Sequence, residues 1–254
     1  MTAERTGARD VETMIDLLWR TRPPGSRGPR GALSLDRIVE TAMEIADADG
    51  VGGVSMRKIA ERLDVTTMSL YRYIPRKEDL LDLMFDAAMG KPDTGAWPED
   101  WRGRLTCYAL DARAAMLARP WLCDIPLSGP PLGPNNLSWL EAALASLDGT
   151  GLSDADMVGL IMILTNYVLS DVRQVVSINR AVPRTGFTYE EWGEIYGRTL
   201  ATRIDPARFP HVVRVATSGV FGPEVASGDE DFMYGVDFLL DGVEALVRRR
   251  DATG

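Results

Sequence analysis

The chain of 254 residues contains few of the side chains that build metal or catalytic sites, with only two cysteines and one histidine. Cys107 and Cys123 are too few for a disulfide framework, as expected of a protein from a reducing compartment. Neither a metal-ligand cluster nor a nucleophile–base pair surrounds His211 in the sequence. We therefore expect no catalytic residue, no metal and no cofactor.

Long apolar runs are also missing, since none approaches the roughly 20 residues needed to span a bilayer. The N-terminus carries acids and arginines before any apolar stretch, unlike a secretory signal. These absences predict a cytoplasmic protein with no membrane partner. No alternating strand pattern occurs, whereas apolar residues recur at helical spacing along the chain. The sequence predicts an all-α fold.

The formal net charge of −9 at first argues against a nucleic-acid partner, but the charge is unevenly distributed. Residues 20–77 hold eleven basic and seven acidic residues, a net charge of +4, which leaves −13 for the rest. Because DNA affinity depends on where the basic groups lie, this segment remains a candidate for binding a polyanion.

Capping residues divide the basic segment into short helices. Ser34, Ser55 and Thr66 are good N-caps, Gly50 is a C-cap glycine, and Pro75 interrupts the chain. The expected helices run from Ser34 to Gly50, over 56–63, over 67–74 and over 76–89. Three short helices with a tight turn between the second and third predict a helix-turn-helix unit.

The third of these helices is the predicted recognition helix. Leu70 and Ile74 form an inward i, i+4 pair, which leaves the remaining side chains available to DNA. Residues 67, 68 and 72 are best placed for base edges, and the two tyrosines and the lysine for phosphates. One tyrosine ring packing into the headpiece is the alternative. The predicted DNA-binding residues are Arg57, Thr66, Thr67, Met68, Ser69, Tyr71, Arg72, Tyr73 and Lys77.

Residues 1–33 form an N-terminal extension with a basic arm. Three prolines and three glycines between residues 20 and 31 prevent a continuous helix there. Arg22, Arg27 and Arg30 are candidates for contacts with the minor groove of DNA. A solvated arm without a partner is the alternative.

The segment at 90–95 separates a helix-turn-helix domain at 34–90 from a helical ligand-binding and dimerisation domain at 97–250. Its helices are expected at about 99–118, 136–147, 154–178, 189–203 and 229–250. The last helix is apolar enough to form half of a four-helix interface between two copies. Packing onto its own subunit alone is the alternative.

Polar residues in the middle of an apolar helix indicate where the second domain would bind a ligand. Asn166, Tyr167 and Asp171 would orient a largely apolar small molecule within a pocket. Internal hydrogen bonding or a dimer contact is the alternative for these three. The remaining candidates for the pocket are Trp101, Tyr108, Met116 and Trp139. The alternative for these four is that they only pack in the hydrophobic core.

The headpiece resembles the TetR family of bacterial regulators. The resemblance covers residues 33–81 and rests on the pattern Leu70-Tyr71-x-Tyr73-Ile74-x-x-Lys77. Residues 121, 130–135 and 139–141 also look like the C-terminal domain of the TetR subgroup. The resemblance implies a homodimer, a palindromic operator and a small molecule that weakens DNA binding. Tetracycline-binding members use a histidine and magnesium, which we do not carry over to a chain with the single His211.

The resulting hypothesis is a repressor that binds double-stranded operator DNA and is released by a small-molecule effector. An effector-independent DNA-binding regulator is one alternative. An all-α enzyme that uses a cavity of the C-terminal domain is the other, although no paired catalytic groups support it.

Overall fold

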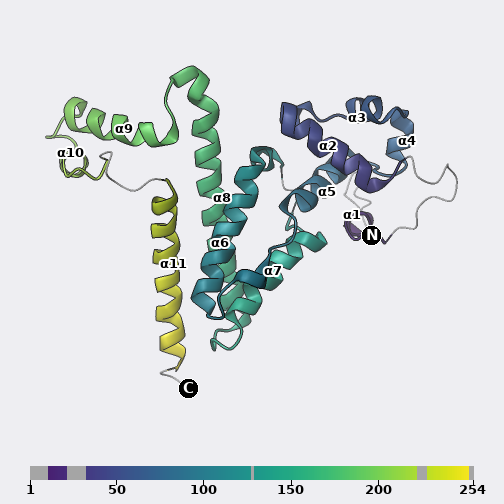
Figure 1. Ribbon diagram of the computed structural model, residues 1–254. Helices are drawn as coiled ribbons and strands as arrows, with labels where there is room; N and C mark the ends of the chain where they lie inside the picture. Colours follow the sequence, from purple (N-terminus) through teal and green to yellow (C-terminus); the bar gives the residue numbers. More distant parts are fainter. Residues whose placement is uncertain (1–10, 22–32, 127–128, 222–227, 252–254) are drawn as a thin grey trace, which may run out of the picture. The chain divides into compact units, whose positions relative to one another are not determined.

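The computed structural model describes residues 11–21, 33–126, 129–221 and 228–251, and Figure 1 labels its α-helices from α1 to α11. No strand occurs in these residues, which confirms the all-α prediction. Arg22, Arg27 and Arg30 lie outside the described residues. The elements are α1 (Val11–Leu18), α2 (Leu35–Asp49), η1 (Val51–Gly53), α3 (Met56–Leu63), α4 (Thr67–Tyr71), α5 (Lys77–Met89), η2 (Thr94–Ala96), α6 (Trp101–Ala118), η3 (Pro120–Asp124), α7 (Pro134–Leu147), α8 (Asp154–Thr185), α9 (Tyr189–Arg203), α10 (Pro210–Ala216) and α11 (Gly228–Asp251).

Five helices begin where their caps predict. In each, a hydroxyl oxygen of the N-cap residue accepts a hydrogen bond from the backbone N–H three residues later, which satisfies one of the helix's orphan donors. In α8 and α9 an acidic side chain at the third position also accepts from the N-cap backbone, completing a capping box. The five capping residues are Ser34, Ser55, Thr66, Ser153 and Thr188.

Two helix ends differ from the prediction. The recognition helix α4 ends at Tyr71 rather than near Ile74, although the Ile74 N–H still donates to the Leu70 carbonyl at 2.9 Å. Helix α8 continues past residue 178 to Thr185, with Pro183 in its last turn. Gly186, at φ 77°, ends it by donating its N–H to the carbonyl of Val182.

The sequence did not predict α1 or α10 as helices. Helix α1 buries Leu17 and Leu18, and its amphipathic run is only eight residues long, too short to be helical without tertiary contacts. Helix α10 starts at Pro210 and buries none of its residues. Both helices are therefore poorly marked by local pattern.

The chain divides into two compact units, residues 1–148 and 149–254. In unit 1, α2 packs against α3 and α5, α3 against α4, and α5 against α1, α6 and α7. The buried side chains of α2 (Ile38, Val39, Ala42, Ile45 and Ala46) form the centre of the headpiece. Since α5 contacts α6 and α7, these two helices belong to the same compact unit as the headpiece.

In unit 2, α8 packs against α11 and α9, and α9 packs against α10. Helix α11 buries Phe232, Val236, Leu240 and Val243 on one face. Gly235 lies against the Tyr167 hydroxyl, and a Cβ there would stand 2.1 Å from the hydroxyl oxygen. This glycine therefore permits a close contact within its own unit.

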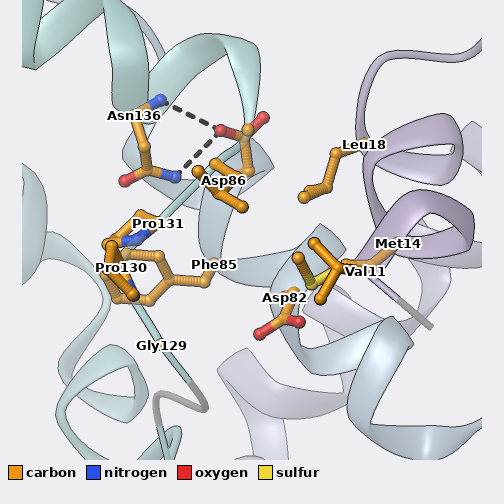
Figure 2. A pocket seen from close by; sticks show the side chains of 12 residues that line it. Val11, Met14, Leu18, Asp82, Phe85, Asp86, Gly129, Pro130, Pro131 and Asn136 are labelled. Carbon is orange, nitrogen blue, oxygen red and sulfur yellow. Dashed lines mark hydrogen bonds between the residues drawn. The ribbon is translucent and has the colours of Figure 1, made fainter. Parts of the chain in front are cut away.

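Helix α7 receives its N-terminal cap from another helix. Its own N-cap residue is Gly133, which has no side chain, and the Asp86 carboxylate of α5 accepts instead from the Asn136 backbone N–H at 2.9 Å (Figure 2). The side-chain amides of Asn136 and Asn135 also donate to this carboxylate, at 2.8 and 3.1 Å. Asp86 is only 5% exposed, so this contact rigidly joins α5 to α7.

Replacing Gly133 with alanine should lower the free energy of unfolding by about 1–3 kcal/mol. The new Cβ would lie 2.1 Å from Oδ1 and 2.3 Å from Cγ of Asp86, and this buried carboxylate is held by three hydrogen bonds. Urea unfolding followed by circular dichroism measures the change. Gly52→Ala is the control, because no atom lies within 4 Å of its Cβ position. Equal stability of the two variants would contradict the steric argument.

Candidate functional site

The recognition helix α4 is held to the headpiece by two buried side chains. Leu70 and Ile74 are both 0% exposed, as their spacing predicts. The N-cap Thr66 accepts from the Ser69 N–H at 3.3 Å, and the two hydroxyls lie 2.9 Å apart. Thr66 and Ser69 are thus engaged in starting the helix, with Thr66 exposed and Ser69 half-buried.

Large exposed side chains cover the outer face of α4 and the turn that follows it. Met68 is 72% and Tyr71 45% exposed, and Arg72 is exposed while Thr67 is half-buried. An exposed methionine has no packing role within its own headpiece. This face has the composition expected of a surface that meets base edges and phosphates.

The cations of α3 and those that follow α4 differ in their partners. On α3, Arg57 pairs with Glu61 at 3.7 Å, Arg62 pairs with Glu44 at 3.5 Å, and Lys58 pairs with Asp49. The hydrogen bond from Lys58 holds the pKa of Asp49 below its ordinary value. These ion pairs within the protein reduce the charge that α3 offers to a phosphate.

The other set lies after the recognition helix. Within the described part of the chain, Arg72, Arg76 and Lys77 are exposed and form no ion pair. Arg76 is the N-cap of α5, and its side chain makes no capping hydrogen bond. Sequence reasoning counted Arg76 in the charge balance but did not single it out, although Pro75-Arg76-Lys77 was its signal. The unpaired positive charge of the headpiece is concentrated here.

Tyr73 is half-buried, and its hydroxyl donates to the Leu33 carbonyl at 3.2 Å, 40 positions earlier in the sequence. The ring therefore ties the turn after α4 to the residue that precedes the Ser34 cap. This contact agrees with the alternative in which one tyrosine packs into the headpiece. A contact from Tyr73 to phosphate stays a prediction. It would have to form while the hydroxyl keeps its hydrogen bond to Leu33.

Four of the seven effector candidates lie in unit 1. Tyr108 of α6 and Trp139 of α7 form an edge-to-face pair with ring centroids 5.7 Å apart, and the Trp139 indole N–H donates to the Gly90 carbonyl at 2.9 Å. Met116 is buried and Trp101 is half-buried. The structure thus brings Tyr108 and Trp139 together, and their contacts also serve the core.

The other three candidates lie on α8 in unit 2. The Asn166 side chain is exposed and donates to the Met162 carbonyl of its own helix at 2.8 Å. Tyr167 stacks on Phe232 of α11 with centroids 5.4 Å apart, and its hydroxyl donates to the Phe232 carbonyl at 3.0 Å. Asp171 is half-buried. These bonds satisfy Asn166 and Tyr167 within unit 2, so their role toward a ligand stays a prediction.

Comparison with known proteins agrees with this arrangement. Residues 38–84 match the family of bacterial regulatory proteins named tetR, and residues 91–247 match the tetracyclin repressor-like C-terminal domain. A transcriptional repressor from Streptomyces coeruleorubidus, DrrR1, is 36% identical over 98% of this chain and 91% of its own length. The chain belongs to the TetR family. It is accordingly a DNA-binding transcriptional regulator.

Solved structures support the same family assignment. Apo ActR from Streptomyces coelicolor has a TM-score of 0.71 and 26% identity, covering 86% of this chain and 98% of that one. ActR in complex with actinorhodin has a TM-score of 0.67 and 25% identity, covering 85% of this chain and 99% of that one. The helix-turn-helix followed by a larger helical region is therefore the fold of a TetR-family regulator.

In this TetR-family chain, η3 touches the headpiece directly. The Trp121 indole N–H donates to Oδ1 of Asp47 on α2 at 2.6 Å, and Trp121 is 3% exposed. The Arg119 guanidinium lies 3.9 Å from the same carboxylate oxygen and 3.7 Å from the Met43 sulfur. Together with the Asp86 contacts to α7, these bonds attach two sides of the headpiece to helices α6 and α7.

Proposed function

We propose that this chain is a repressor that binds a palindromic operator as a homodimer and is released by a small-molecule effector. The observation that carries the proposal is the anchored recognition helix with unpaired Arg72, Arg76 and Lys77 beside it. Because these cations form no ion pair with any described residue, no such pair has to be broken when they approach phosphates.

Each headpiece residue has a proposed role. Thr67, Met68 and Arg72 read base edges, with the arginine donating two hydrogen bonds to a guanine. Tyr71 and Lys77 contact phosphates, and Lys77 does so from the first turn of α5, the end of a helix that favours an anion. Thr66, Ser69, Tyr73 and Arg57 are secondary contacts, because each also makes a bond within the headpiece.

Helices α8 and α11 support the homodimer. The most apolar 18-residue window of α8 has a mean hydropathy of 1.4, yet only 22% of it is buried in this chain. This helix is also long enough and apolar enough to cross a membrane, judged by length and composition alone. We favour a second copy as its cover, because α11 beside it exposes Tyr234 by 76% and Phe238 by 71%, and four such helices would form a closed bundle.

The proposed effector is a small, largely apolar molecule. ActR, the 25%-identical neighbour, has been solved in complex with actinorhodin and with (S)-DNPA. We propose that the effector of this chain contacts aromatic and polar groups of the C-terminal domain. The candidates are Trp101, Tyr108, Met116, Trp139, Asn166, Tyr167 and Asp171. An effector-independent regulator is the second candidate, because Asn166 and Tyr167 already have partners in unit 2.

We further propose that residues 34–90 act as the DNA-binding domain and 97–250 as the effector and dimerisation domain, in a cytoplasmic protein. The contacts of Asp86 and Trp121 would then be the mechanical link between these domains. An effector that favours another headpiece spacing must supply a coupling free energy of about 1–3 kcal/mol to affect binding. The named relatives are regulators, so we do not propose catalysis.

Selection of bound sites from random DNA by the purified full chain tests the function. We expect a palindrome whose half-sites lie about 34–36 Å apart along the helix, one turn of B-DNA. Candidate ligands are then titrated against the labelled operator complex. A selected site without two-fold symmetry would refute the dimeric mode of binding, and a complex that no ligand releases would favour the effector-independent regulator.

A further inference from the structure

An apolar groove of about 400 Å³ runs between α8 and α11 within unit 2. The two helices are antiparallel. Arg250 at the end of α11 pairs with Asp156 near the start of α8 at 2.9 Å. Further along α8, Tyr167 stacks on Phe232 near the start of α11. Among the described residues that line the groove, Asp156 alone is charged, and the others are aliphatic or glycine.

Two glycines in the interior of these helices line the groove, Gly159 of α8 and Gly242 of α11. No atom of the described chain lies within 4 Å of the Cβ position at either residue, whereas a Cβ at Gly235 would collide with Tyr167. After proline, glycine is the least favourable residue in a helix interior. Gly159 and Gly242 therefore weaken their helices without a packing reason in the described chain, which indicates a close neighbour from outside it.

The same side of α11 carries a side chain that fits the groove. Phe238, one helical turn before Gly242, is 71% exposed, and Tyr234, one turn earlier, is 76% exposed. Phe238 does not line the groove of its own chain. Since a cavity of roughly 150 Å³ already holds a benzene ring, this groove has room for the ring of a phenylalanine. Two projecting rings followed by a hollow make this side of α11 complementary to itself.

We propose that Phe238 of each subunit packs over Gly242 of the other subunit, so that the two copies of α11 cross antiparallel near Leu240. This inference rests on the proposed homodimer and specifies the register of its interface. In a two-fold symmetric interface, residues at equal distances from the axis face each other. Residues 238 and 242 lie two positions on either side of residue 240. The glycine allows the helices to approach closely, and the ring fills the groove that it leaves.

The charges of α11 agree with an antiparallel crossing. Its first turn carries three acidic residues, 229–231, and its last turn carries three arginines, 248–250. With the axis at residue 240, residue 231 of one copy lies level with residue 249 of the other, and residue 230 with residue 250. Opposite charges then lie at corresponding ends of the two helices, whereas a parallel crossing would bring like charges together.

Replacing Gly242 with leucine fills the groove and should weaken the dimer. We expect the dimer dissociation constant to rise by about tenfold or more, measured on the full, fluorescently labelled chain by sedimentation velocity over a dilution series to nanomolar concentration. Gly193→Leu is the matched control, at an exposed glycine of α9 that also has no atom within 4 Å of its Cβ position. It should leave the dissociation constant unchanged. Leucine favours a helix more than glycine does, so neither variant should lose helical circular dichroism.

A double variant tests whether the two side chains meet. Phe238→Ala combined with Gly242→Leu again places a large residue opposite a small one, so it should dimerise about tenfold more tightly than Gly242→Leu alone. Such rescue is expected only of side chains that face each other. A dimer unaffected by Gly242→Leu, or a double variant no tighter than Gly242→Leu, would overturn this register and leave the homodimer intact. A wild-type chain that is monomeric would refute the proposed homodimer as well.

Discussion

Replacing Arg72 with alanine should weaken operator binding by about 1–3 kcal/mol, roughly 5- to 150-fold, and relax the preference for one base pair in each half-site. Arg72 is exposed and forms no ion pair among the described residues, so its loss leaves the headpiece intact. Quantitative gel-shift assays with the selected operator, and with operators changed at each position, measure both effects.

Lys77→Ala is the matched comparison, because the same charge is removed from a residue proposed to contact phosphate. Affinity should fall for every DNA sequence alike, and the slope of log K against log salt should decrease by about one per lysine lost. Arg198→Ala, on an exposed position of α9, controls for the change in net charge. If neither headpiece variant lowers affinity below that of the Arg198 variant, α4 is not the recognition helix.

Introducing a charge on the exposed face of α8 and α11 should have the largest effect, because it would separate the two subunits. Phe238→Asp and Met162→Asp replace side chains that are 71% and 60% exposed in the single chain, so each subunit should still fold. In a dimer each aspartate would be buried opposite its symmetry mate without a cation. We expect a monomer in light-scattering measurements and a loss of operator affinity of about 100-fold or more, since the half-sites then bind separately.

The control for this experiment is Phe209→Asp, which makes the same change at a residue that is 41% exposed between α9 and α10. It should remain dimeric and bind the operator normally. Dimers of unchanged affinity with Phe238→Asp would exclude α11 from the interface, and monomers with Phe209→Asp would move the interface toward α9 and α10.

The candidate DNA surface could be predicted well because its determinants are local. Leu70 and Ile74 are four residues apart on one helix, so their spacing alone placed them inside. The exposure of Met68 and Arg72 follows from the same geometry. The position of the Tyr73 side chain could not be predicted from spacing, because its partner Leu33 lies 40 positions earlier in the sequence.

The effector-binding residues, by contrast, could not be predicted from local spacing. Polar residues in an apolar helix indicated Asn166 and Tyr167, but sequence cannot tell a ligand contact from an internal bond. Asn166 donates to its own helix, and the Tyr167 hydroxyl donates to a carbonyl 65 positions later.

The sequence alone determined an all-α chain, because it lacks cysteine clusters and strand patterns. It also determined where the main helices start, through the caps at Ser34, Ser55, Thr66, Ser153 and Thr188. These features depend on residues three or four positions apart, which interact in any helix. The tertiary structure alone decided that α1 forms, that Asp86 caps α7 from 50 positions away, and that Trp121 meets Asp47. Such contacts exist only once the chain has brought distant segments together, because their energies depend on burial and geometry that no local pattern contains.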